Sequence, residues 1–212
     1  MDKQQAQLEE LKEIRSLMEQ SSRFLALSGI AGVIVGAIAI AGIIVAYVHL
    51  GLYNNIQPYY ETINVTSDEG NKQNALFLLS DSIVVLVTSL LFGVIFSVRK
   101  AKKQKMAAWD ATAKRMFINM AIPLVAGGVY AIILCYHDNI FLIAPSMLIF
   151  YGMALLNASR YTINDIRYLG IIEISIGLLA SVFVEYGLLL WGLGFGIFHI
   201  IYGLSIYFKY ER

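Results

Sequence analysis

The stretch RYLGIIEISIGLLASVFVEYGLLLWGLGFGIFHIIYGLSIYFK, residues 167–209, decides the fold that this sequence predicts. It holds two apolar blocks on either side of Glu185-Tyr186-Gly187, and a cation stands at each of its ends. A helix needs about 20 apolar residues to cross the core of a bilayer, and each block is close to that length. The stretch therefore predicts a membrane hairpin, with spans at about 168–184 and 187–208 joined by a tight turn.

The composition of the whole chain favours the same class of protein. Of its 212 residues, 58% are hydrophobic and 15% are charged, whereas a soluble domain has about 25% charged residues. We therefore expect an all-α polytopic membrane protein, with six transmembrane helices arranged as three hairpins over residues 23–209. The other apolar blocks predict spans at about 24–50, 76–98, 116–136 and 140–156.

The N-terminal segment, residues 1–22, is polar except for an apolar stripe at helical spacing that includes Leu8, Leu11 and Met18. This pattern predicts a cytoplasmic amphipathic helix. Two interpretations remain open. The stripe either binds a protein partner or a second copy of the chain, or the helix lies on the lipid headgroups as an extension of the first span.

The distribution of charge predicts the orientation. If the N-terminus is cytoplasmic, six spans place residues 1–23, 99–115, 157–168 and 209–212 in the cytoplasm, and these hold every lysine and arginine except Lys72. Short cytoplasmic loops carry such an excess of cations. We therefore expect both termini in the cytoplasm and the chain in the inner (plasma) membrane.

The most basic run follows the second predicted span. Its cations stand beside a membrane helix, where they set the topology and meet anionic lipid, so we expect lipid and not nucleic acid as their partner. The residues concerned are Arg99, Lys100, Lys102, Lys103 and Lys105.

The three predicted hairpins either share an internal repeat or resemble one another only as apolar hairpins flanked by arginine do. The second span of each contains an aromatic residue followed by glycine, at Phe92-Gly93, Tyr151-Gly152 and Tyr202-Gly203. Small residues let membrane helices approach closely. We therefore expect Gly93, Gly152 and Gly203 at helix contacts, together with the small-xxx-small pair formed by Gly32 and Gly36 in the first span.

Ionisable residues inside a span are costly and are candidates for function. Glu173 lies six residues beyond Arg167, and His199 lies ten residues before Lys209. In antiparallel helices these depths differ by about one turn, so we expect the two side chains to be able to meet. The pair either relays or senses protons, or serves only to satisfy its own polar groups. Asp81 either opens an outward-facing polar pocket or is hydrated near the interface.

Motifs for catalysis and for metal binding are missing from the sequence. It contains no His-x-x-x-His, no Gly-rich phosphate loop and no Gly-x-Ser-x-Gly. We therefore expect no metal or cofactor, and the sequence does not support an enzyme. Two functions are favoured: a non-enzymatic structural, sensory or partner-binding component, or a small-solute or proton-coupled transporter or channel that uses Glu173 and His199. A membrane-embedded enzyme is a third hypothesis that ranks behind them.

The segment RSLMEQSSRFLALSGIAGVIVGAIAIAG, residues 15–42, resembles the opening of a family of uncharacterised bacterial six-span membrane proteins. In that family a methionine-containing amphipathic helix runs through Ser-Ser-Arg-Phe into a Ser-Gly-rich first span. The resemblance implies six spans and a bacterial membrane. It implies no activity, so it assigns no role to any residue of this chain.

Overall fold

A computed structural model describes residues 27–51, 69–105, 109–137 and 139–212. Over these ranges the chain forms helices and short turns, without a strand. The amphipathic helix expected over residues 1–22, including Leu8, Leu11 and Met18, lies outside the described residues.

The described elements follow one another in this order along the chain. They are α2 (Gly29–His49), α4 (Glu69–Lys103), α5 (Ala111–Tyr136), the 3-10 turn η1 (Ile140–Leu142), α6 (Ile143–Ala158), α7 (Ile166–Val182), the 3-10 turn η2 (Val184–Tyr186), α8 (Gly187–Gly192), the π-helix η3 (Leu193–Phe198) and α9 (His199–Tyr210).

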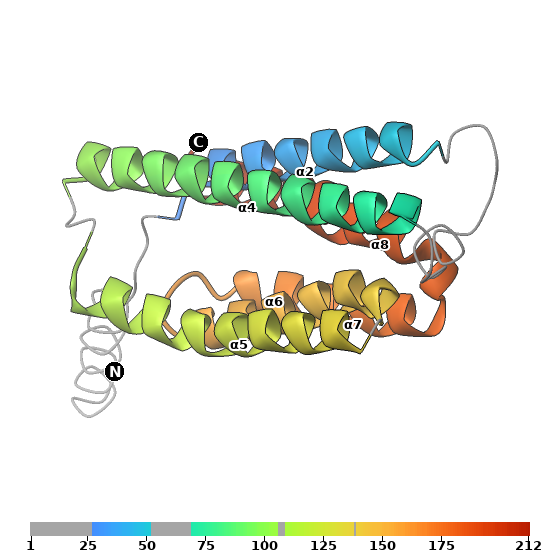
Figure 1. The fold of residues 1–212 in the computed structure, drawn as a ribbon. Helices are drawn as coiled ribbons and strands as arrows, with labels where there is room; N and C mark the ends of the chain where they lie inside the picture. Colours follow the sequence, from blue (N-terminus) through green and yellow to red (C-terminus); the bar gives the residue numbers. More distant parts are fainter. Residues whose placement is uncertain (1–26, 52–68, 106–108, 138) are drawn as a thin grey trace, which may run out of the picture.

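The helices run side by side in two layers, one made by α2 and α4 and the other by α5, α6 and α7 (Figure 1). The last segment passes from α7 to the other layer, so that α9 returns along α2. The closest neighbours are α6 with α7, α5 with α6, and α2 with α9, while α4 packs chiefly against α2. The core that positions the candidate site lies where α2, α6, α7 and the α8–α9 segment meet.

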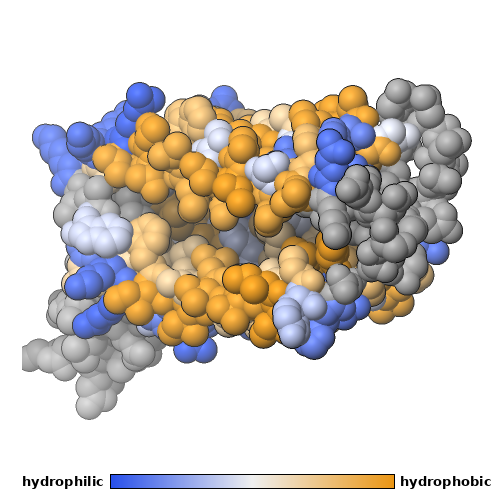
Figure 2. All heavy atoms as spheres, viewed as in Figure 1, coloured by the Kyte–Doolittle hydropathy of each residue, from blue (hydrophilic) through white to orange (hydrophobic). Residues whose placement is uncertain are grey.

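Within the described residues, five helical segments are long and apolar enough to cross a membrane. They are Gly29–His49, Leu76–Lys103, Ala111–Tyr136, Ile140–Ala158 and Val184–Tyr210. The remaining long helix, α7, has 17 residues. Figure 2 shows hydrophobic side chains over the middle of the visible face and hydrophilic ones towards its two ends. The fold is therefore that of an all-helical, multi-pass membrane protein.

The boundaries of α4 differ from the predicted span. The helix begins at Glu69 and continues to Lys103, whereas the apolar block alone indicated about 76–98. The first basic residues after the span are therefore helical. Lysine and arginine are good helix formers, and cations stabilise the last turn because it carries the negative end of the helix dipole.

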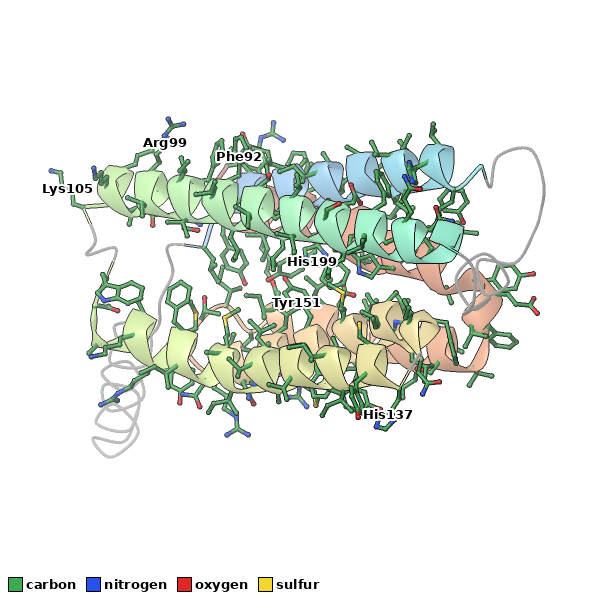
Figure 3. The ribbon with its side chains drawn as sticks, in the orientation of Figure 1. Phe92, Arg99, Lys105, His137, Tyr151 and His199 are labelled. Carbon is green, nitrogen blue, oxygen red and sulfur yellow. The ribbon has the colours of Figure 1, made fainter. Side chains whose placement is uncertain are left out.

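The chain gathers most of its described cations at one end of the bundle, which we call the basic end. There α4 finishes, α5 begins, and α9 ends beside the start of α2. Arg99 and Lys105 lie at this end, and His137 lies towards the other (Figure 3). The charge asymmetry predicted from the loops is thus present in three dimensions.

Glu211 ties three helix ends together at the basic end. Its Oε1 atom accepts hydrogen bonds from the backbone N–H of Gly29, at 2.6 Å, and from Nζ of Lys100, at 3.0 Å. Lys100 also donates to the carbonyl of Leu27, at 2.6 Å. Lys100 is therefore engaged within the protein, while Arg99, Lys102, Lys103 and Lys105 are exposed.

Glycines bring α2 and α9 into backbone contact. A Cβ atom on Gly203 would lie 2.5 Å from the backbone N of Val33, and one on Gly32 would lie 3.0 Å from the Cα of Gly203. A Cβ on Gly36 would lie 2.6 Å from the carbonyl oxygen of Gly196. The small-xxx-small pair of the first span therefore packs within its own chain, against the last segment.

Gly152 lies at a helix contact, whereas Gly93 does not. A Cβ on Gly152 would lie 2.6 Å from the carbonyl oxygen of Gly170, so α6 and α7 also approach through glycines. Around Gly93, however, no described atom lies within 4 Å of a Cβ position. The expectation that Gly93 packs against another helix is wrong for the described part of the chain, because α4 lies at the edge of the bundle and turns this position away from its one main neighbour.

Candidate functional site

Glu173 lies on the face of α7 that packs into the bundle. The residues that share this buried face, among them Leu169, Gly170, Ile176 and Gly177, recur at helical spacing. The side chain of Glu173 is 0% exposed. A carboxyl group in this position has left both water and the headgroup region, so its surroundings must compensate the cost of burial.

His199 approaches Glu173 from the opposite direction. It is the first residue of α9 and directly follows the π-helix η3. Its Nδ1 atom lies 3.2 Å from Oε1 of Glu173. The contact between the two residues, predicted from their depths in antiparallel helices, is therefore present.

Tyr151 of α6 completes the cluster. Its hydroxyl lies 2.9 Å from Nε2 of His199, and Nδ1 of His199 lies 3.1 Å from the carbonyl oxygen of Gly194. A carbonyl only accepts, so Nδ1 carries a hydrogen. Nε2 then accepts from the Tyr151 hydroxyl when the imidazole is neutral, and donates to it when the imidazole is protonated. Figure 3 shows Tyr151 and His199 close together between the two layers.

The carboxyl group of Glu173 lacks the partners that such groups normally have. Neither of its oxygens has a hydrogen-bond partner among the described residues; the imidazole is within ion-pair distance but directs its Nδ1 hydrogen bond to Gly194. Most buried polar atoms in proteins are hydrogen-bonded, and exceptions call for an explanation. This carboxyl group is one such exception among the described residues.

Gly194 makes room for that carboxyl group. A Cβ atom at this position would lie 2.5 Å from Oε2 of Glu173 and 2.6 Å from Cδ2 of Leu148. Gly194 belongs to η3, and π-helical turns often mark functional positions because they shift side chains and carbonyls out of the regular pattern. The glycine-rich segment 192–196 packs on α2 through Gly196 and makes room for the site through Gly194.

The charges of the cluster follow from its burial. An ionised Glu173 beside a neutral His199 would leave an uncompensated buried charge, which costs several kcal/mol. One proton, on either the carboxyl group or the imidazole, makes the pair neutral overall. The arrangement can therefore bind a proton, and His199 can pass it to or receive it from Tyr151.

The structure does not bring Asp81 to this cluster. Asp81 is half-buried on α4, and its Oδ2 atom lies 3.5 Å from the Cβ position of Gly42 on α2. The main contact of α4 is with α2, whereas Glu173 and His199 lie on α7 and α9. Asp81 is therefore separate from the pair.

Sequence reasoning missed the third member of the cluster and the residue that accommodates it. Tyr151 stood out only as part of the repeated aromatic-glycine pair, and the position of its hydroxyl depends on how α6 faces α9. Gly194 was one of several glycines in the last span. The available signal was that a tyrosine and a histidine in different predicted spans both stood at a depth close to that of Glu173.

Other features of the described residues offer no competing site. An apolar cavity of about 420 Å³ lies between α2 and the α8–η3 segment, and it is lined by residues such as Ile40, Leu190 and Ile197. Neither Glu173 nor His199 lines it. Over the described ranges, no group of three or more His, Cys, Asp or Glu side chains is placed to hold a metal ion.

Neither a protein-family model nor a curated protein nor a solved structure matches this chain. Its class rests on the fold, an all-helical multi-pass membrane protein, with one buried acid–imidazole–tyrosine cluster in the described part of the bundle.

Proposed function

We propose that the chain crosses the bacterial inner membrane six times, as three hairpins with both termini in the cytoplasm. Five candidate spans support the count. The 17 residues of α7 reach the lower end of the range for membrane helices, which is about 17–25 residues. The basic end would face the cytoplasm, where Arg99, Lys102, Lys103 and Lys105 meet anionic headgroups.

Cysteine labelling tests this topology. In a Cys135→Ala background, Lys103→Cys at the basic end and Glu185→Cys at the opposite end each provide one site for a membrane-impermeant maleimide. In intact cells with a permeabilised outer membrane we expect labelling at position 185 and protection at position 103. Labelling at 103 in intact cells would reverse the proposed orientation, and equal labelling of both would contradict an odd number of crossings between the two positions.

We further propose that the protein is a non-enzymatic, proton-responsive component of that membrane, with Glu173, His199 and Tyr151 as its proton-binding site. The observation that carries this proposal is the wholly buried carboxyl group of Glu173, which lacks a hydrogen bond among the described residues and touches the imidazole of His199. A pair with only a structural role would be expected to satisfy its polar atoms.

The groups around the cluster favour protonation as the event it responds to. From α6 and α9 the titratable side chains nearest to the pair are Tyr151 and Tyr202, and α2 contributes none over Gly29–Ala46. Histidine changes charge near neutral pH. A change in the charge of His199 alters its bond to Tyr151 and its attraction to Glu173, and so alters how α6, α7 and α9 are held together.

Tryptophan fluorescence provides a direct test. Trp191 packs against Phe195, which stacks on His199, and Trp109→Phe leaves Trp191 as the single tryptophan. In purified protein we expect Trp191 emission to change with pH as the cluster gains or loses its proton. Glu173→Gln, which keeps the shape but cannot ionise, should abolish or strongly displace that titration.

Asp81→Asn is the matched control, because it removes an intramembrane carboxylate outside the cluster. It should leave the Trp191 titration as in the parent. A flat fluorescence profile in the parent, or an unchanged profile in Glu173→Gln, would contradict the proposal.

Proton-coupled transport is a second candidate, favoured by the interruption of the last span by η3 beside the site. Interrupted helices are common at the substrate and ion sites of transporters. The described apolar cavity does not reach the cluster, so protons fit the site better than a solute. Proton flux in reconstituted vesicles that is lost in Glu173→Gln would support this candidate, and the absence of flux in the parent would exclude it.

A further inference from the structure

Tyr202 is a second buried polar group without a partner. It lies on α9, one helical turn from His199 towards the basic end, and its hydroxyl has no hydrogen-bond partner among the described residues. It packs in the same apolar cluster as Tyr151. On α9 it stands between His199, which bonds to Tyr151, and Lys209 and Tyr210, which bond to Asp165. An unpaired buried hydroxyl between such groups is a natural position for a bridging water.

These residues form a row from the buried carboxyl group to the surface. Glu173 contacts His199, and His199 bonds to Tyr151. Beyond Tyr202 stands Asp165, at the start of α7, whose Oδ2 atom accepts from Lys209 at 2.7 Å and from Tyr210 at 3.2 Å. Lys209 and Tyr210 are exposed at the basic end.

The opposite direction is apolar. From Glu173 towards the other end of the bundle, the buried core consists of Ala144, Leu148, Ile176 and Trp191 with their neighbours. The buried polar side chain on α6 in that half, Ser146, donates to the carbonyl of Leu142 in its own helical turn. A proton leaving the cluster in this direction would meet hydrocarbon, whereas towards the basic end it meets hydroxyl groups.

We infer that the cluster exchanges its proton only with the aqueous phase at the basic end, through Tyr151, Tyr202 and Asp165. This inference rests on the proposed proton-binding function. The carboxylate of Asp165 takes a proton from water and passes it, directly or through a bridging water, to the oxygen of Tyr202. Tyr202 gives its own hydroxyl proton towards Tyr151, and Tyr151 gives its proton to Nε2 of His199. Each hydroxyl accepts one proton and gives one, so the row is unchanged and the cluster has gained a proton.

The inference predicts that the protein responds to the pH of one side of the membrane. The single-tryptophan protein is placed in sealed vesicles, which are sorted by whether a cysteine at position 103 can be labelled from outside. After a rapid acid jump of the external solution, Trp191 fluorescence should change at once in vesicles with the basic end outward. In the other orientation it should change only as protons leak across the bilayer, and a protonophore should remove the difference.

Tyr202→Phe tests the row itself. It removes one hydroxyl and should slow the response several-fold in vesicles with the basic end outward, while the equilibrium titration remains. Tyr207→Phe is the matched control: it removes a hydroxyl from the same helix outside the row and should respond like the parent. A fast response from the opposite end, or a Tyr202→Phe protein as fast as the parent, would overturn the inference and leave the proton-binding site standing. If Trp191 fluorescence of the parent does not change with pH at equilibrium, the proposed function itself is overturned.

Discussion

The seam between α2 and α9 and the exposed face of α4 are both apolar, yet only the seam is a helix contact. Along the seam, glycines let two backbones touch. On α4, aliphatic side chains such as Leu79, Val84 and Leu90 are more than half exposed. In the most apolar stretch of α4, 6% of the residues are buried inside the protein, whereas in that of α2 the share is 33%.

The difference shows what holds membrane helices together. Lipid is as apolar as leucine, so burying a leucine against another helix gains little over leaving it in lipid. Close backbone contact gains dispersion energy that lipid chains cannot match. We therefore expect the fold to depend on the glycine seam and on a few polar contacts, and to be insensitive to changes on α4.

The largest effect is expected at Gly203. In Gly203→Ala the new Cβ would lie within 3 Å of the backbone of Gly29, Gly32 and Val33, and backbone cannot move aside as a side chain can. Separating α2 from α9 should cost about 1–3 kcal/mol or more of unfolding free energy. Unfolding of the purified protein in mixed detergent micelles measures the loss.

Ser205→Ala is the control for that experiment. Ser205 is exposed on the same helix, and its hydroxyl bonds only to the carbonyl of Ile201. Surface changes of this kind alter stability by about 0.5 kcal/mol or less. Equal stability of Gly203→Ala and Ser205→Ala would show that the seam does not hold the bundle.

An intermediate effect is expected at the basic end. Glu211→Gln keeps the size of the side chain but removes the charge that binds the N–H of Gly29 and the ammonium of Lys100. Both groups of the ion pair are about one-tenth exposed, and hydrogen bonds to charged groups contribute about 1.5–3 kcal/mol when shielded. We expect a loss of about 1–2 kcal/mol in the same unfolding assay.

A double-mutant cycle with Lys100→Met separates the ion pair from the cap on α2. If the two residues stabilise each other, the double variant should lose less than the sum of the single losses. Glu185→Gln, an exposed carboxylate at the opposite end, should be silent. Additive losses would show that Glu211 acts on α2 alone.

Much of this architecture could be predicted from the sequence, because the signals are local. Long apolar blocks indicate helices in lipid, and the positions of Arg and Lys indicate which helix ends lie together. Glu173 and His199 were identifiable for the same reason: an ionisable residue in an apolar block is visible without any knowledge of the fold. That the two side chains could meet followed from helix rise in antiparallel helices, since the depth of each could be counted from a flanking cation.

What could not be predicted depends on how each helix is rotated and on which helices become neighbours. Phe92-Gly93 and Tyr202-Gly203 look alike in the sequence, but one lies on a helix at the edge of the bundle and the other in the backbone contact between α2 and α9. The π-helix η3 is equally invisible to a 3.6-residue pattern. It sets the direction of the Gly194 carbonyl and the room for Glu173, and so decides the geometry of the cluster.

The smallest effect is expected at Gly93, which tests the exposed face of α4 in the way that Gly203 tests the seam. Gly93→Ala adds a methyl group where no described atom lies within 4 Å. Alanine favours a helix over glycine by about 0.5–1 kcal/mol, so the variant should be as stable as the parent or slightly more stable. The identical glycine-to-alanine change would then lower stability at Gly203 and raise it at Gly93, with one unfolding assay measuring both. A clear loss at Gly93 would mean that this face of α4 is covered in the membrane by protein and not by lipid, and the distinction between seam and exposed face would fail.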